Sequence, residues 1–149
     1  MSNHFVKNQG GQNKRIVIDD GRKVYDIYNQ RNEKIGQFVF SPADMGIVER
    51  YDHAVNEFDD IQNTMGNDGG AEVIKLASDR MKKEIDALFD ADVSGSFFSH
   101  ISPFSLLESG EFYVVNVLNA VKGIVEIETG ARLNRAKTRA SKYTQKYHN

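Results

Sequence analysis

The chain has 149 residues, of which 40% are hydrophobic and 27% charged, and its formal net charge at pH 7 is −2. This length suits one domain that buries about two-thirds of the surface of its unfolded chain. Because there is no cysteine, disulfides, thiolate metal sites and cysteine nucleophiles are excluded. The near-neutral charge argues against a chain that binds polyanions over its whole surface.

Charge is divided unevenly along the chain. Residues 131–149 hold six basic side chains and no acidic one, which leaves thirteen basic against twenty-one acidic residues, a charge of −8, before them. The sequence therefore predicts a flexible arm over residues 1–13, a single α+β domain over 14–130 and a basic tail over 131–149, either a helical extension or disordered. The basic side chains of the tail are Arg132, Arg135, Lys137, Arg139, Lys142 and Lys146.

No segment has the pattern of a membrane or export signal. The first residues lack the apolar core of a signal peptide. The longest apolar-rich run, 112–127, is interrupted by four polar residues and is too short to span a bilayer. We therefore expect a soluble protein of the cell interior with no membrane partner.

Two segments between Lys23 and Phe40 alternate as the strands of a β-hairpin do. The first runs from Lys23 to Asn29 and the second from Ile35 to Phe40, with polar residues at 30–34 between them. The apolar run Ile16–Ile18 ends at the turn sequence Asp19-Asp20-Gly21 and is a candidate for a third strand. We expect an N-terminal sheet of two or three short strands.

A helix start follows the hairpin directly. Ser41 can accept a hydrogen bond from a free backbone N–H, Pro42 suits the first helical position, and Asp44 favours the positive end of a helix. Apolar residues then recur at three- and four-residue steps as far as Met65, and the glycine-rich segment 66–70 ends the helix.

The rest of the domain is predicted to be helical with one long loop. A second helix covers about 71–89 and packs antiparallel on the first across the glycine loop. Residues 90–102 are predicted as a loop and 103–107 as a short helical turn. A third long helix covers 111–129, is apolar on most sides and is closed by Gly130.

The apolar stripe of the first predicted helix has two interpretations. By default it closes the core of the domain. If the hairpin covers only the beginning of the helix, the distal residues would instead bind a partner helix. These candidate partner-binding residues are Val55, Phe58, Ile61 and Met65.

Two polar groupings invite a metal interpretation. The segment 90–95 matches the first half of a calcium loop, with oxygens at Asp90, Asp92 and Ser94, but Ile101 stands where the bidentate acid is needed. Glu49, His53 and Glu57 share one helix face at four-residue spacing, but no second such set exists for a di-metal bundle site. We expect a polar loop and a solvated face, and no metal.

The sequence offers little support for an enzyme. Ser99 and His100 are adjacent, but the Gly-x-Ser-x-Gly turn of a nucleophile elbow is missing. Neither a Walker loop nor a dinucleotide-binding glycine pattern occurs. We therefore expect no catalytic residues and no cofactor.

The basic tail is the main electrostatic feature. Its six positive charges are interleaved with Tyr143 and Tyr147, a composition that suits nucleic acid. The same charges suit contact with the acidic body of this chain or of a neighbouring copy, or plain solubility. Protein contact or solubility is favoured over nucleic acid.

Two parts of the chain carry a recognisable pattern. The first is the hairpin-to-helix segment 24–55, VYDIYNQRNEKIGQFVFSPADMGIVERYDHAV. The second is segment 85–130, in which a helix ending in Asp-x-Leu-Phe is followed by a Phe-containing loop, a Ser-Pro turn, a Gly-Glu-Phe sequence and a long helix. In this chain those features are Asp86–Phe89, Phe97-Phe98, Ser102-Pro103 and Gly110–Phe112.

With these features the chain resembles the small tail assembly chaperones of long-tailed bacteriophages and prophages of Gram-positive bacteria. The resemblance covers roughly half of the chain, and relatives often have Gly where this chain has Asp90. It implies a non-enzymatic protein of the host cytoplasm that binds the tape-measure protein and assists assembly of the tail tube protein around it. It also implies absence from the finished virion, and repeated weak contacts with a long client favour a homo-oligomer.

Two alternatives to a chaperone stay open. One is a small phage-encoded regulator or inhibitor that binds nucleic acid or a host nucleoprotein through residues 132–147. The other is a structural virion protein of the tail or of the head–tail joint, which would be found in purified particles.

Overall fold

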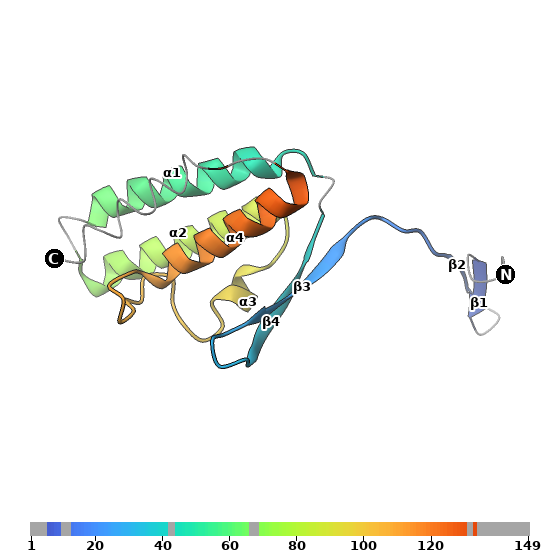
Figure 1. Ribbon diagram of the computed structural model, residues 1–149, viewed down its shortest axis with the longest axis horizontal. Coiled ribbons are helices and arrows are strands. Elements are labelled where there is room, and N and C mark those ends of the chain that lie inside the picture. Colours follow the sequence, from blue (N-terminus) through green and yellow to red (C-terminus); the bar gives the residue numbers. More distant parts are fainter. Residues whose placement is uncertain (1–5, 10–12, 42–43, 66–68, 131–132, 134–149) are drawn as a thin grey trace.

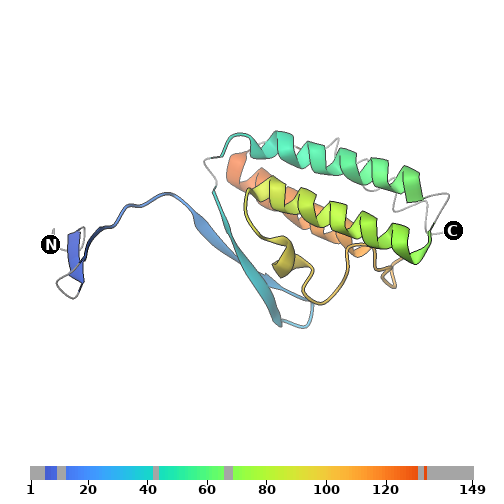
Figure 2. The same cartoon turned by 180° about the vertical axis from the view of Figure 1, so that it is seen from behind.

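The computed structural model describes residues 6–9, 13–41, 44–65, 69–130 and 133. Three long helices, α1 (Ile47–Met65), α2 (Ala71–Phe89) and α4 (Tyr113–Thr129), lie side by side (Figure 1). The hairpin of β3 (Lys23–Tyr28) and β4 (Lys34–Phe40) lies beside them, and the view from behind in Figure 2 shows the short helix α3 (Ser94–Phe97) between the hairpin and α2. The predicted α+β class, a hairpin followed by about three helices, is confirmed.

The β3–β4 hairpin is closed by a turn built on Asn29. The strands are antiparallel, with Tyr25 opposite Phe38 and Val24 opposite Val39. The Asn29 side-chain oxygen accepts hydrogen bonds from the backbone N–H groups of Arg31 (2.8 Å) and Glu33 (3.0 Å). A short polar side chain that bonds its own backbone in this way favours a turn, which explains why the polar segment 30–34 reverses the chain.

The inner face of the hairpin carries the aromatic residues. Phe38 and Phe40 are 4% and 1% exposed. The ring of Phe38 lies 4.8 Å from that of Phe89 on α2 and 5.3 Å from that of Phe97 on α3, measured between centroids. The strict alternation of strand side chains puts Val24, Asp26 and Tyr28 on the opposite, outer face, as the sequence predicted.

The candidate third strand does not join this sheet. Ile16 ends β2 (Asn13–Ile16), which pairs antiparallel with β1 (Val6–Gln9) in a separate two-stranded sheet. Figure 1 shows this β1–β2 hairpin away from the helices, at the end of an extended connection. The apolar run Ile16–Ile18 could have paired with β3. Strand β2 instead pairs with β1, whose residues belong to the predicted flexible arm.

Helices α1 and α2 form the predicted antiparallel pair. The predicted helix start at Ser41–Asp44 is wrong, because α1 begins at Ile47. Ser41 and Asp44 belong to the turn before it, where the Asp44 side chain accepts a hydrogen bond from the Gly46 N–H at 3.0 Å; Pro42 lies outside the described residues. Helix α2 ends at Asp90, whose φ of 52° is in the left-handed region and whose N–H bonds the Ala87 carbonyl. Left-handed C-caps are usually glycine, so Asp90 takes a conformation that glycine would adopt without strain.

Helix α3 is a correction to the predicted loop over 90–102, and the predicted helical turn over 103–107 is wrong. The Asp86 carboxylate accepts hydrogen bonds from the N–H groups of Val93 (2.8 Å) and Ser94 (2.7 Å) and from the Ser94 hydroxyl (3.0 Å). This satisfies the free donors at the start of a four-residue helix. Residues 103–107 instead contain a turn and a single bridge from Leu106 to Phe112.

Helix α4 matches its predicted course and ends at Gly130, which is left-handed with a φ of 75°. Five of its apolar side chains are less than 3% exposed: Val114, Val115, Leu118, Val121 and Val125. Beyond Gly130 the chain returns to the core, because Leu133 is 8% exposed and its N–H donates to Glu126 Oε2 at 2.8 Å. Among the described residues, no helix is long and apolar enough to cross a membrane.

We predict opposite effects on stability from two glycine substitutions. A Cβ at Gly36 would lie 2.7 Å from Ser96 Cβ and 2.9 Å from Ser96 Cα, whereas one at Gly123 in α4 meets nothing within 4 Å. Gly36→Ala should lower the free energy of unfolding by about 1–3 kcal/mol, and Gly123→Ala should raise it by about 0.5–1 kcal/mol. Urea unfolding of both variants beside the parent measures this, and an unchanged G36A would contradict the close approach of β4 to α3.

Candidate protein-binding surface

The residues predicted to bind a partner helix lie in the core. Val55 and Phe58 are 0% exposed and Ile61 is 2% exposed, while Met65 is partly buried against the same cluster. The Phe58 ring stacks on that of Phe104 at 6.1 Å with an interplanar angle of 8°. The stripe therefore closes the core, the interpretation that the sequence favoured, and a partner cannot reach its three buried members in this conformation.

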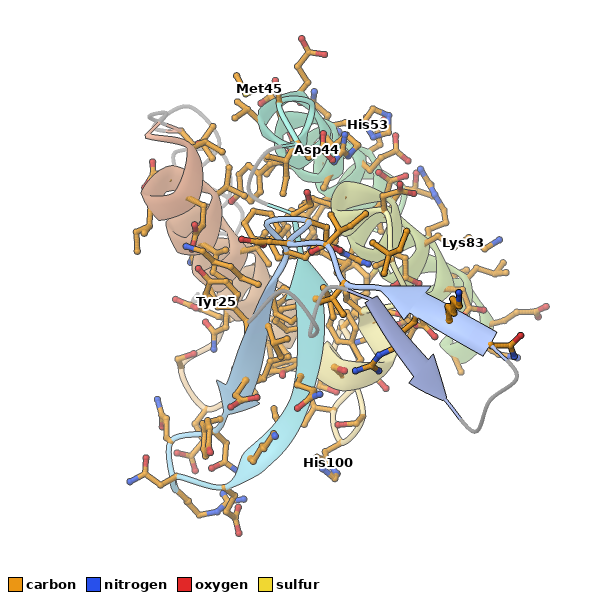
Figure 3. All side chains as sticks on the ribbon, turned by 90° about the vertical axis from the view of Figure 1, so that its right-hand side faces the viewer. Tyr25, Asp44, Met45, His53, Lys83 and His100 are labelled. Atoms are coloured by element: carbon orange, nitrogen blue, oxygen red, sulfur yellow. The ribbon has the colours of Figure 1, made fainter. Side chains whose placement is uncertain are left out.

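The predicted trio on the polar face of α1 does not converge on one point. His53 Nδ1 lies 2.8 Å from Glu84 Oε1, and Glu57 Oε1 accepts from Arg80 Nη2 at 2.5 Å, so two of the trio reach across to α2. Glu49 is exposed. In Figure 3, His53 and Lys83 lie on the side of the molecule where α1 and α2 meet. These polar contacts align the two helices.

A third polar contact joins the start of α1 to the end of α2. Arg50 Nε donates to the Leu88 carbonyl at 2.9 Å, and its guanidinium also pairs with the Asp44 carboxylate. The hydrogen bond from Arg50 holds the pKa of Asp44 below its ordinary value of 3.8, with smaller help from the Gly46 N–H and the charge of Arg50. Asp44 therefore stays ionised and fixes Arg50 over the helix end.

The remaining polar candidates serve the loop between α2 and α4. In the calcium-like segment Asp90 is a helix cap and Asp92 is exposed, and the carboxylate that organises the loop is Asp86. The Ser99 hydroxyl donates to the Ile35 carbonyl at 3.2 Å, and His100 is exposed at the end of the molecule opposite Met45 in Figure 3. Within the described part of the chain, no group of three or more His, Asp or Glu side chains is placed to hold a metal ion.

The six basic tail residues, Arg132, Arg135, Lys137, Arg139, Lys142 and Lys146, lie outside the described residues. Only Leu133 of the tail is described, and it is a core residue. Binding of the tail to protein or nucleic acid therefore stays a prediction.

Half of the exposed apolar side chains are close together in the sequence, three of them at or just after the end of β2 and two on the outer face of β3. Of ten large apolar residues exposed in the described part of the chain, five lie between residues 16 and 28. We call these five the outer apolar surface: Ile16 (72% exposed), Val17 (48%), Ile18 (77%), Val24 (62%) and Tyr28 (55%). Val39, partly exposed and opposite Val24 on β4, adjoins it. Such exposed apolar side chains are candidates for contact with another protein.

The two edges of the β3–β4 sheet differ. Along β4, the Ser96 hydroxyl donates to the Gln37 carbonyl at 2.7 Å and the Ser99 hydroxyl to the Ile35 carbonyl, so side chains of α3 and its loop cover this edge. Along β3, no further strand is present among the described residues. Natural proteins protect sheet edges against association with other chains, so a β3 edge that no described strand joins is a second feature of a binding surface.

Contacts at the inner face of β3 hold this edge in place. The Tyr25 hydroxyl and Lys23 Nζ both bind the Glu128 carboxylate near the end of α4, Lys23 at 3.0 Å. Figure 3 shows Tyr25 on the side of β3 that faces α4. Burial, and then the hydrogen bond and charge of Glu128, raise the pKa of Tyr25 to about 12. Strand β3 is thus fixed to the helices by its inner side chains while its outer face stays exposed.

Comparison with protein-family models, curated proteins and solved structures finds no match. The class that the fold and the site define is a small α+β scaffold with an exposed apolar surface at one end. Sequence reasoning identified Ile16–Ile18 and Val24 as strand residues but not as a surface. The sequence signal for an exposed surface was the run Ile16–Ile18. Successive strand side chains point to opposite faces, so a sheet with one buried face cannot bury three consecutive apolar residues.

We predict that core and surface apolar residues differ sharply in their effect on stability. Phe58→Ala should lower the free energy of unfolding by about 3–5 kcal/mol, because it removes a fully buried ring. Ile18→Ala should change it by less than about 0.5 kcal/mol, because its side chain is 77% exposed. Chemical denaturation of both variants measures this. A small effect of Phe58→Ala would contradict the burial of the apolar stripe of α1 in the core.

We predict that Asp44→Asn destabilises the protein in a pH-dependent way. A carboxyl whose pKa is lowered on folding adds stability above its unfolded pKa, and this stability is lost as the pH falls through the lowered value. The parent should therefore exceed D44N in urea midpoint at neutral pH, and the difference should shrink below pH 3.8. Glu108→Gln, at an exposed loop residue, is the control, and an equal pH dependence in both variants would contradict the role of Asp44.

Proposed function

We propose that this protein is a non-enzymatic tail assembly chaperone of a long-tailed phage or prophage. It would bind the tape-measure protein in the host cytoplasm and assist assembly of the tail tube protein around it, without remaining in the virion. The resemblance of segments 24–55 and 85–130 to that family supports the proposal. The observation that carries it is the outer apolar surface, which offers exposed apolar side chains next to an uncovered sheet edge.

The outer face of β3–β4 is the part of this surface that suits a client. Val24 and Tyr28 lie on it, and Val39 is the cross-strand neighbour of Val24. A helix-rich client exposes apolar side chains until it is assembled, and covering them removes apolar area from water at about 25 cal/mol per Å². A small patch gives a weak contact, which suits a chaperone that must later release its client, and several copies along one client raise the total affinity.

The polar groups of the domain are consistent with such a scaffold. His53, Glu57 and Arg50 make interhelical contacts, and Asp86 caps α3. These groups contribute to the arrangement of the helices and the hairpin. They support a function that depends on the shape of the domain and its outer surface.

The test is co-expression of the full chain with a tape-measure protein from the phage or prophage that encodes it. We expect the parent to keep the client in a soluble complex that survives pull-down. The variant Val24→Asp with Tyr28→Asp should lose most of this complex, because two charges replace apolar contacts. Leu76→Asp is the matched control, since Leu76 is 60% exposed on α2, and it should retain the complex.

Three results would count against the proposal. A client that aggregates equally with and without the parent would overturn it. Equal loss in the Val24/Tyr28 and Leu76 variants would place the client elsewhere. Detection of the chain in purified particles would favour a structural virion protein.

A further inference from the structure

By the arm we mean residues Asn13–Ile18, not the predicted flexible arm over 1–13. We propose that the arm of one copy adds as an antiparallel strand to the β3 edge of a second copy. The donor and the acceptor are both present in every chain, so the partner is another molecule of this protein. This contact needs no client and goes beyond the chaperone function.

The acceptor is the edge of β3 described above. The opposite edge of the sheet is occupied because Ser96 and Ser99 donate to the carbonyls of Gln37 and Ile35. Gly36 lies so close to Ser96 that a Cβ there would clash with it, which leaves no room for a strand beside β4. A strand that joins this sheet therefore has to join at β3.

The donor is an extended segment with two special properties. One edge of β2 is paired with β1, and the other edge carries no strand among the described residues. The segment continues from Ile16 through Val17 and Ile18, three consecutive β-branched residues that are 72%, 48% and 77% exposed. Such residues are strongly favoured in strands, and here they lie on a segment that contacts little of its own domain (Figure 1).

The connection between donor and acceptor directs the arm away from its own β3. Asp19 Oδ1 accepts from the Gly21 N–H at 2.9 Å and Asp20 Oδ1 from the Arg22 N–H at 3.1 Å. Gly21 has a φ of 73°, a conformation that glycine adopts without strain. These local bonds fix a turn between β2 and β3, and Figure 1 shows β2 carried away from the β3 edge of its own chain. The edge of a second copy is then the available partner, as in exchange of an element between protomers.

One antiparallel register matches the outer face and the charges, and it sets Lys14 opposite Ile27 on the inner face. Six arm residues oppose the six residues of β3 when Val17 faces Val24. Arg15 then faces Asp26, an opposite-charge pair of the kind that stabilises neighbouring strands. Asp26 Oδ1 also lies 3.3 Å from Lys34 Nζ of its own hairpin, so the carboxylate would contact two basic side chains. Ile16 and Ile18 fall on the inner face beside Tyr25 and Lys23. The result is a continuous antiparallel sheet in the order β1-β2-β3-β4, with its first two strands from one copy.

The experiment uses the absence of cysteine from the chain. One sample carries Val17→Cys and a second carries Val24→Cys; they are unfolded, mixed and refolded together, then treated with a short bifunctional thiol reagent. We expect dimers that contain one chain of each variant, because opposing Cβ atoms of paired strands lie about 4.5–5.5 Å apart. A closure of the arm on its own β3 cannot link the two variants.

The control mixture pairs Val17→Cys with Leu76→Cys, an exposed site on α2. The proposal is overturned if Val17→Cys and Val24→Cys cross-link no more than this control. It is also overturned if a single chain that carries both Val17→Cys and Val24→Cys links only within itself.

A second measurement needs no cross-linking. Light scattering should give the parent a mass of at least twice the 16.8 kDa of one chain at high concentration. Ile16→Lys with Ile18→Lys should return the mass to that of one chain, whereas Ile127→Lys, at an isoleucine that is 81% exposed on α4, should not. A parent that stays at 16.8 kDa at every concentration would overturn the proposal.

Neither result depends on the tape-measure protein. If the arm cross-links but the client is never kept soluble, the exchange stands and the chaperone function fails. If the client is bound but the mixed dimers do not form, the function stands and the exchange fails.

Discussion

The contact between the inner face of the hairpin and the ends of α2 and α3 is the constraint on which the rest of the structure depends. An isolated two-stranded sheet is marginally stable in water, so β3 and β4 need the rings of Phe89 and Phe97 against Phe38. Phe97 is held there by α3, and α3 is capped by Asp86. Because the inner face packs on the helices, association with other molecules is left to the outer face and the β3 edge.

Most of the fold could be predicted from local signals. The spacing of apolar residues located the long helices, and Gly130 marked the end of the last one, where the chain adopts a left-handed conformation. Helix α3 could not be predicted in this way. Its four residues have no period of their own, and it begins where a carboxylate from the end of α2, Asp86, satisfies its N–H groups.

The site was harder to predict, because its meaning depends on distant partners. The partners of His53 and Glu57 lie on α2, more than twenty residues away, so a face that suggested a metal site holds two helices together. The apolar stripe at Phe58 was predicted by default to be core, and the stacking of Phe104 on Phe58 confirms it. The pattern of Ile16–Ile18 indicated a strand but did not determine which strand it pairs with.

Burial of Leu133 determines where the basic charges of this protein can act. The basic tail leaves the domain from this fixed point. The point lies close to the end of α4, where Glu128 also binds Lys23 and Tyr25 of β3. The chain therefore enters the tail where α4 and β3 are joined, so the start of the tail and the hairpin share one end of α4.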